Sequence, residues 1–190
     1  MNAPHTMQDL TRAAWLKTYY FARAAFAVAW LLAVPRVDAH GAAAAVLLVV
    51  YPAWDALANL ADARRSGGLA VNRTQALNVA ASLLVAAAIG AALPDMHRVL
   101  AVFGTWAILS GLLQLGTGLR RWKSVGAQWP MILSGAQSAL AGAFFILQAR
   151  APAEPSVASL AGYAGFGAFY FLVSALSLSA GSWRRKSSGT

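Results

Sequence analysis

The sequence has no cysteine and few charged residues, and each absence excludes whole classes of protein. Without cysteine, the chain of 190 residues forms no disulfide, no thiolate nucleophile and no cysteine-ligated metal site. Charged residues make up only 11% of the chain, while 59% of its residues are hydrophobic. An ordinary soluble domain has about 25% charged residues. A soluble fold of this composition would expose large apolar patches and aggregate, so we expect lipid to be the solvent.

Catalytic and metal-binding motifs are equally scarce. The histidines are His5, His40 and His97, and none has a second ligand three or four residues away. A metal site is therefore not expected. There is no glycine-rich phosphate loop, no Ser-His-Asp set and no His-Glu-x-x-His motif. The sequence predicts no catalytic residue, no cofactor and no enzymatic activity.

The sequence does contain six apolar stretches, each close to the roughly 20 residues that a membrane-spanning helix needs. They lie at about residues 13–34, 41–61, 74–93, 98–119, 127–148 and 157–181. The prediction is an all-α polytopic membrane protein, with residues 13–183 forming one six-helix transmembrane domain. A tail of residues 1–12 precedes this domain, and a basic tail of residues 184–190 follows it. Pro52 and Pro130 fall inside the second and fifth spans, where proline can kink a helix.

The basic residues predict the orientation of the chain, because six spans put both termini on one side of the membrane. That side also carries most of the positive charge, at Arg12, Lys17, Arg64, Arg65, Arg73, Arg120, Arg121, Lys123, Arg184, Arg185 and Lys186. The other side has Arg36, Arg98 and Arg150. Since basic residues concentrate in cytoplasmic loops, both termini are predicted to be cytoplasmic. The net charge of +9 is then explained by the lipid bilayer as partner, without nucleic acid.

The spans also form an apparent internal repeat of three helical hairpins, at about residues 13–61, 74–119 and 127–181. Aligning the second span with the fourth matches Tyr51 with Trp106. Each even-numbered span would then have an aromatic residue, a small or polar pair one turn later, a further polar residue, and a basic residue where the span ends. Hairpins repeated in this way keep the same orientation about an axis along the membrane normal. The alternative is chance similarity, because helices rich in alanine, glycine and leucine align easily.

The chain resembles a known family, best over spans two to six and least in the N-terminal tail. The segments Trp106-Ala-Ile-Leu-Ser-Gly-Leu, Arg120-Arg-Trp-Lys and Ser134-Gly, together with Gly142, are similar to the HdeD-like proteins. These are bacterial inner-membrane proteins built from a short repeat. The resemblance implies six helices in the bacterial cytoplasmic membrane and a role in resisting acid stress, with the molecular activity unknown. Asp55 has no acidic counterpart in the fourth or sixth span, so a site built on it is not a feature of every repeat.

Two ionisable residues at membrane depth are the main candidate site. Arg23 and Asp55 each lie roughly 9 to 12 Å from the cytoplasmic ends of their spans, at 1.5 Å per residue. Because charges at this depth need partners, we predict an Arg23–Asp55 ion pair. Lys17 and Asp62, nearer the cytoplasm, are predicted to form a second, wetter pair. The first pair is either a structural staple or a proton-responsive element. Protonation of Asp55 would leave Arg23 in a low dielectric, which favours the staple.

Neutral polar and small residues complete the predicted bundle. Polar side chains expected in its interior are Asn59, Asn78, Gln114 and Gln137. Small residues expected to let helices approach closely are Gly111, Ser134, Ser138, Gly142 and Gly165. Packing within the bundle is the usual role of such small residues, and a homo-oligomer contact is the less common one.

The sequence thus predicts a non-enzymatic protein of the bacterial inner membrane that serves envelope or acid-stress tolerance. A small transporter or channel is an alternative, and it would need a polar path near Asp55. Another alternative is an accessory subunit that functions with a membrane-protein partner.

Overall fold

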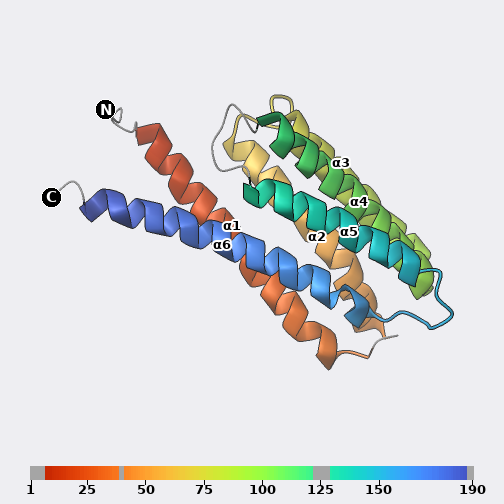
Figure 1. The fold of residues 1–190 in the computed structure, drawn as a ribbon. Helices are drawn as coiled ribbons and strands as arrows, with labels where there is room; N and C mark the ends of the chain where they lie inside the picture. The colour runs from red at the N-terminus through yellow and green to blue at the C-terminus, as the bar shows by residue number, and fades with distance from the viewer. Residues whose placement is uncertain (1–6, 39–40, 122–128, 188–190) are drawn as a thin grey trace. The chain divides into compact units, whose positions relative to one another are not determined.

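The computed structural model describes residues 7–38, 41–121 and 129–187, and every regular element in these ranges is a helix (Figure 1). His5, His40 and Lys123 lie outside the described residues. The α-helices are α1 (Met7–Ala33), α2 (Ala42–Arg65), α3 (Arg73–Ala92), α4 (Met96–Arg121), α5 (Trp129–Gln148) and α6 (Ala161–Ser187). Two short 3₁₀ helices, η1 (Val34–Arg36) and η2 (Val157–Leu160), precede α2 and α6. The all-α prediction is confirmed.

The helices are long and apolar, as membrane spans are. Within the described residues, five segments are long and apolar enough to cross a membrane, namely Ala14–Arg36, Ala42–Arg65, Arg73–Ala92, Met96–Gly116 and Val157–Ala180. The apolar part of α5, Ile132–Gln148, is shorter than these five segments. Large apolar side chains stay exposed on these helices, with Leu140 at 72% and Leu84 at 71%. Such surfaces aggregate in water but are stable against lipid tails, so the protein is a helical, membrane-embedded one.

The helix boundaries differ from the predicted spans in two ways. α1 begins at Met7 and α6 continues to Ser187, so both helices extend into the predicted tails. Hydropathy marks where a span leaves the lipid core, whereas arginine, lysine and glutamine continue a helix readily beyond that point. Pro130 is the second residue of α5 as described, and residues 122–128 before it lie outside the described range, so the expected kink there stays a prediction. Pro52 lies inside α2, which continues through it.

The chain divides into two compact units. One is Leu32–Tyr163, and the other joins α1 as far as Leu31 with α6 from Ala164. In the first unit α2 packs against α3, α3 against α4, and α4 against α5, so consecutive helices are neighbours (Figure 1). The predicted hairpin at residues 74–119 corresponds to the contacting pair α3 and α4. The other two predicted hairpins each join helices from different units, and the threefold repeat stays a prediction.

Glycines bring the backbones of α4 and α5 into direct contact. A Cβ atom added at Gly142 would lie 2.5 Å from the backbone oxygen of Gly104, and one added at Gly111 would lie 2.6 Å from the oxygen of Gly135. Both distances are far below an ordinary contact, so no side chain fits at these positions. The two glycines on each helix are seven residues apart. This period is typical of helices that cross at about 20°.

We call this contact the glycine seam, formed by Gly104, Gly111, Gly135 and Gly142. Hydrogen bonds and aromatic rings stabilise its middle. The Ser138 hydroxyl donates to the backbone oxygen of Ala107 at 3.0 Å and lies 3.1 Å from the Tyr163 hydroxyl. The ring of Tyr163 packs against those of Trp106 and Phe145, with centroids 6.3 and 6.0 Å away. The contact face of α5 is therefore formed by residues 135, 138 and 142, at helical spacings of three and four.

The predicted packing residues fall at different places in the structure. Gly111, Ser138 and Gly142 lie in the seam between α4 and α5. Ser134 is half-buried on α5. A Cβ atom at Gly165 of α6 would lie 3.9 Å from the Leu31 side chain, which is an ordinary contact. The position of Gly165 therefore does not require glycine.

Candidate functional site

The Asp55 carboxylate is the centre of a polar cluster between α2 and α3. Its Oδ2 atom accepts a hydrogen bond from the Ser82 hydroxyl of α3 at 2.7 Å and one from the Asn59 side-chain amide at 3.1 Å. The same amide donates to the Asp55 backbone oxygen at 2.9 Å, one turn earlier in α2. Ser82 is only 1% exposed and Asn59 is 9% exposed. Neutral donors on two helices thus satisfy a carboxylate within a span.

A second carboxylate contact continues this polar cluster along the helices. The Gln75 side-chain amide of α3 donates to Asp62 Oδ2 of α2 at 3.2 Å. Asp62 lies seven residues after Asp55, and Gln75 lies seven residues before Ser82, so one antiparallel register accounts for both hydrogen bonds. We call the aligned residues Asp55, Asn59, Asp62, Gln75 and Ser82 the α2–α3 polar seam.

The same register extends beyond the polar seam. It places Leu48 opposite Ile89, and both side chains are fully buried. It also places Asn78 opposite Asn59, and the Asn78 side chain is half-buried. Asp55 and Asn59 therefore belong to one contact between α2 and α3. Gln114 of α4 and Gln137 of α5 are half-buried on the other helix pair.

The two predicted ion pairs each combine residues from different units. Asp55 and Asp62 belong to the unit Leu32–Tyr163, whereas Lys17 and Arg23 belong to the unit of α1 and α6. The pairs Arg23–Asp55 and Lys17–Asp62 stay predictions. What the first unit does show is that both carboxylates already accept hydrogen bonds from neutral side chains of α2 or α3.

Within its own unit, Arg23 is held by aromatic side chains. Its guanidinium donates to the Tyr19 hydroxyl at 2.7 Å, and the guanidinium carbon lies 4.3 Å from the centroid of the Phe171 ring. Tyr20 stacks on the same Phe171 ring at 6.3 Å. A cation over an aromatic face gains roughly 0.5 to 2 kcal/mol. These contacts join α1 to α6 and stabilise a positive charge inside a span.

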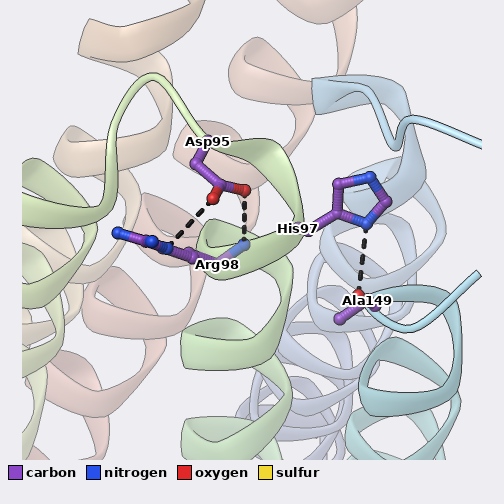
Figure 2. A network of polar contacts seen from close by, with 4 residues as sticks. All are labelled: Asp95, His97, Arg98 and Ala149. Atoms are coloured by element: carbon purple, nitrogen blue, oxygen red, sulfur yellow. Dashed lines mark hydrogen bonds and ion pairs between the residues drawn. The ribbon is translucent and has the colours of Figure 1, made fainter.

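Figure 2 shows a further polar group where α4 begins. Asp95 accepts a hydrogen bond from the Arg98 backbone at 3.1 Å and pairs with the Arg98 guanidinium at 3.0 Å, which caps the helix. His97 points the other way, and its Nδ1 atom lies 3.2 Å from the backbone oxygen of Ala149 (Figure 2). His97 therefore fastens the start of α4 to the chain just after α5.

Arginines gather at both ends of the unit Leu32–Tyr163. Arg64 and Arg65 end α2, and Arg73 begins α3, so these three lie at one end. The opposite end has Arg36 in η1, Arg98 in the first turn of α4, and Arg150 directly after α5. All six side chains are exposed. The structure thus separates the same two groups of arginines as the sequence prediction, while the side on which each lies stays a prediction.

Comparison of the chain with known protein families, with curated proteins and with solved structures finds no match. Among the described residues, no three or more His, Cys, Asp and Glu side chains lie together as a metal site would require. The polar contacts within the described spans include those of the α2–α3 polar seam and those of Arg23 with Tyr19 and Phe171.

Proposed function

We propose that this chain is a six-span, non-enzymatic protein of the bacterial cytoplasmic membrane, with both termini in the cytoplasm, that supports envelope or acid-stress tolerance. The stress role comes from the resemblance of spans two to six to the HdeD-like proteins. Five helices have the length and hydropathy of spans. α5 has 20 residues, which at 1.5 Å each reach about 30 Å, the thickness of the hydrocarbon core. This length supports α5 as the sixth span.

One observation carries the non-enzymatic part of the proposal. The carboxylates of α2 accept hydrogen bonds from Asn59, Gln75 and Ser82, in one register that also aligns buried apolar residues. Interhelical hydrogen bonds of this kind contribute on average about 0.6 kcal/mol each in membrane proteins. Such a pattern favours a role in fixing how α2 and α3 pack, because each acid is part of the helix contact.

A deletion strain tests the physiological half of the proposal. Cells lacking the protein are compared with wild type for survival at low pH and high cell density. We expect reduced survival, restored by a plasmid that supplies the complete chain. A matched plasmid supplies a chain with Gly142→Ala, which should weaken the α4–α5 contact and restore less. Equal survival of the deletion strain and wild type would remove the stress role and leave the membrane topology intact.

A small transporter or channel is the second candidate, and the α2–α3 polar seam is the observation that favours it. Two carboxylates seven residues apart in one helix contact form the beginning of a polar path through the membrane. The purified chain in proteoliposomes, loaded with a pH-sensitive dye, decides between the candidates. A proton or cation flux that Asp55→Asn abolishes supports transport. Absence of flux above protein-free vesicles supports the first candidate.

A further inference from the structure

The turn between α2 and α3 is closely fastened by hydrogen bonds. The Gly68 amide donates to the Ala63 backbone oxygen at 2.7 Å, which closes the end of α2. The Asn72 side-chain amide donates to the backbone oxygens of Ser66 at 2.7 Å and Gly68 at 2.9 Å. Gly67 and Gly68 have φ of 98° and 90°, values that favour glycine. The turn therefore holds the end of α2 and the start of α3 in a fixed relation.

This fastened turn presents positive charge together with an apolar side chain. Arg64, Arg65 and Arg73 are exposed around it. Val71, within the turn, is 74% exposed, more than any other large apolar side chain described.

The length of α2 places this turn in the headgroup layer of a bilayer. α2 has 24 residues, so it is about 36 Å long at 1.5 Å per residue. The hydrocarbon core is about 30 Å thick, and the headgroup regions bring a bilayer to about 40 to 45 Å. The last turn of α2, with Arg64 and Arg65, therefore emerges among the lipid phosphates.

We propose that the α2–α3 turn is a binding surface for anionic phospholipid headgroups. Guanidinium groups bind phosphate with two parallel hydrogen bonds, and three of them lie at the ends of two neighbouring helices. Val71 suits the boundary between headgroups and acyl chains, as apolar side chains of interfacial segments do. The inference rests on the membrane placement in the proposed function and is independent of the stress role.

Native mass spectrometry of the complete chain in detergent tests this surface. The probes are phosphatidylglycerol and phosphatidylcholine with the same acyl chains. The test variant is R64Q/R65Q/R73Q, and the control is R36Q/R98Q/R150Q, which removes three exposed arginines from the opposite end. Each basic residue near an anionic surface changes affinity about fivefold. We expect the test variant to bind phosphatidylglycerol at least tenfold more weakly, with the control within about twofold of wild type.

Several results would overturn the proposal. Equal losses in the test and control variants would show a general charge effect, and equal losses for both lipids would show that the headgroup charge is irrelevant. Displacement of phosphatidylglycerol by excess inorganic phosphate would indicate a free-anion site instead. R64K/R65K/R73K keeps the charge but loses the paired guanidinium hydrogen bonds, so it should bind phosphatidylglycerol more weakly than the unchanged chain and more tightly than R64Q/R65Q/R73Q. A lysine variant that folds normally and binds no better than the glutamine variant would mean that charge is not the cause.

A label on the otherwise cysteine-free chain covers the case in which the test variant does not fold. A fluorophore attached through S66C should be quenched more by brominated phosphatidylglycerol than by brominated phosphatidylcholine. Equal quenching by the two lipids would overturn the proposal. A label that neither brominated lipid quenches would instead show that the turn does not lie at the membrane surface, so that the proposed membrane placement itself is wrong.

Discussion

Gly142→Ala should damage the α4–α5 seam more than its size suggests. The added methyl carbon would lie 2.5 Å from the Gly104 oxygen and 2.7 Å from the Ile108 nitrogen. Both are backbone atoms, which cannot rotate away as a side chain does. Close carbon–oxygen contacts in proteins are about 3.3 to 3.6 Å, so the helices must separate by about 1 Å. That shift would also break the hydrogen bond of 3.0 Å from Ser138 to Ala107.

The expected free-energy change follows from three contributions. Overpacking of a tight contact costs about 1 to 3 kcal/mol. The lost interhelical hydrogen bond adds about 0.6 kcal/mol. Replacing glycine by alanine inside a helix stabilises the helix by about 1 kcal/mol. The free energy of unfolding of the variant should therefore be lower by about 0.6 to 2.6 kcal/mol, because overpacking and the lost hydrogen bond together exceed the gain in helix propensity.

Unfolding of the purified protein by increasing amounts of sodium dodecyl sulfate in detergent micelles measures this loss. The helical circular dichroism signal reports unfolding, and the fluorescence of tryptophans, including buried Trp106, reports packing. Gly90→Ala in α3 is the matched control, because an added Cβ there meets no atom within 4 Å. The control should be neutral or slightly stabilising. If Gly142→Ala is as stable as Gly90→Ala, the glycine seam is not a close backbone contact.

Three further variants test other contacts. Ser82→Ala removes the hydroxyl bonded to Asp55, and a double-mutant cycle with Asp55→Ala should give a coupling of about 0.6 kcal/mol. His97→Ala should free the chain at Ala149, costing about 1 kcal/mol and speeding hydrogen exchange of the neighbouring amides. Combining Arg23→Asp with Asp55→Arg should restore the membrane expression that either single variant loses, if the two residues pair.

Each of these three tests has its own refutation. Ser174→Ala serves as the control for Ser82→Ala, since the Ser174 hydroxyl bonds to Tyr170 within the same helix. A coupling energy no larger than zero between Ser82 and Asp55 would contradict the hydrogen bond between them. Unchanged hydrogen exchange of the amides near Ala149 would show that His97 does not hold this part of the chain. A charge-swapped protein expressed no better than the single variants would exclude the pair.

The helices could be predicted from the sequence, because hydropathy and charge are local properties of a segment. The predicted spans and the observed helices agree closely except at Met7 and Ser187, where polar residues continue a helix beyond the lipid core.

The polar seam could be predicted only in part. Asp55 and Asn59 stand out as polar residues in an apolar span, but Ser82 and Gln75 of α3 were missed. A single serine in a helix is unremarkable until the register with its neighbour is known. The available signal was the spacing, because Gln75 and Ser82 are seven residues apart, as Asp55 and Asp62 are.

Two other contacts show the same limit. Gly104 was missed, although it lies seven residues before Gly111 of the predicted packing set. The contact of Arg23 with Phe171 joins the first and last helices of the chain. Such a contact depends on which helices meet, and local sequence patterns do not contain that information.

Thiol labelling of two single-cysteine variants tests the six-span membrane topology most directly, since the natural chain has no cysteine. S66C lies in the α2–α3 turn and A153C follows α5, at the opposite end of the unit. With a membrane-impermeant maleimide on cells with a permeable outer layer, A153C should react at once. S66C should react only after the cytoplasmic membrane is lysed. Reaction of both variants in unlysed cells, or of S66C alone, would contradict the account.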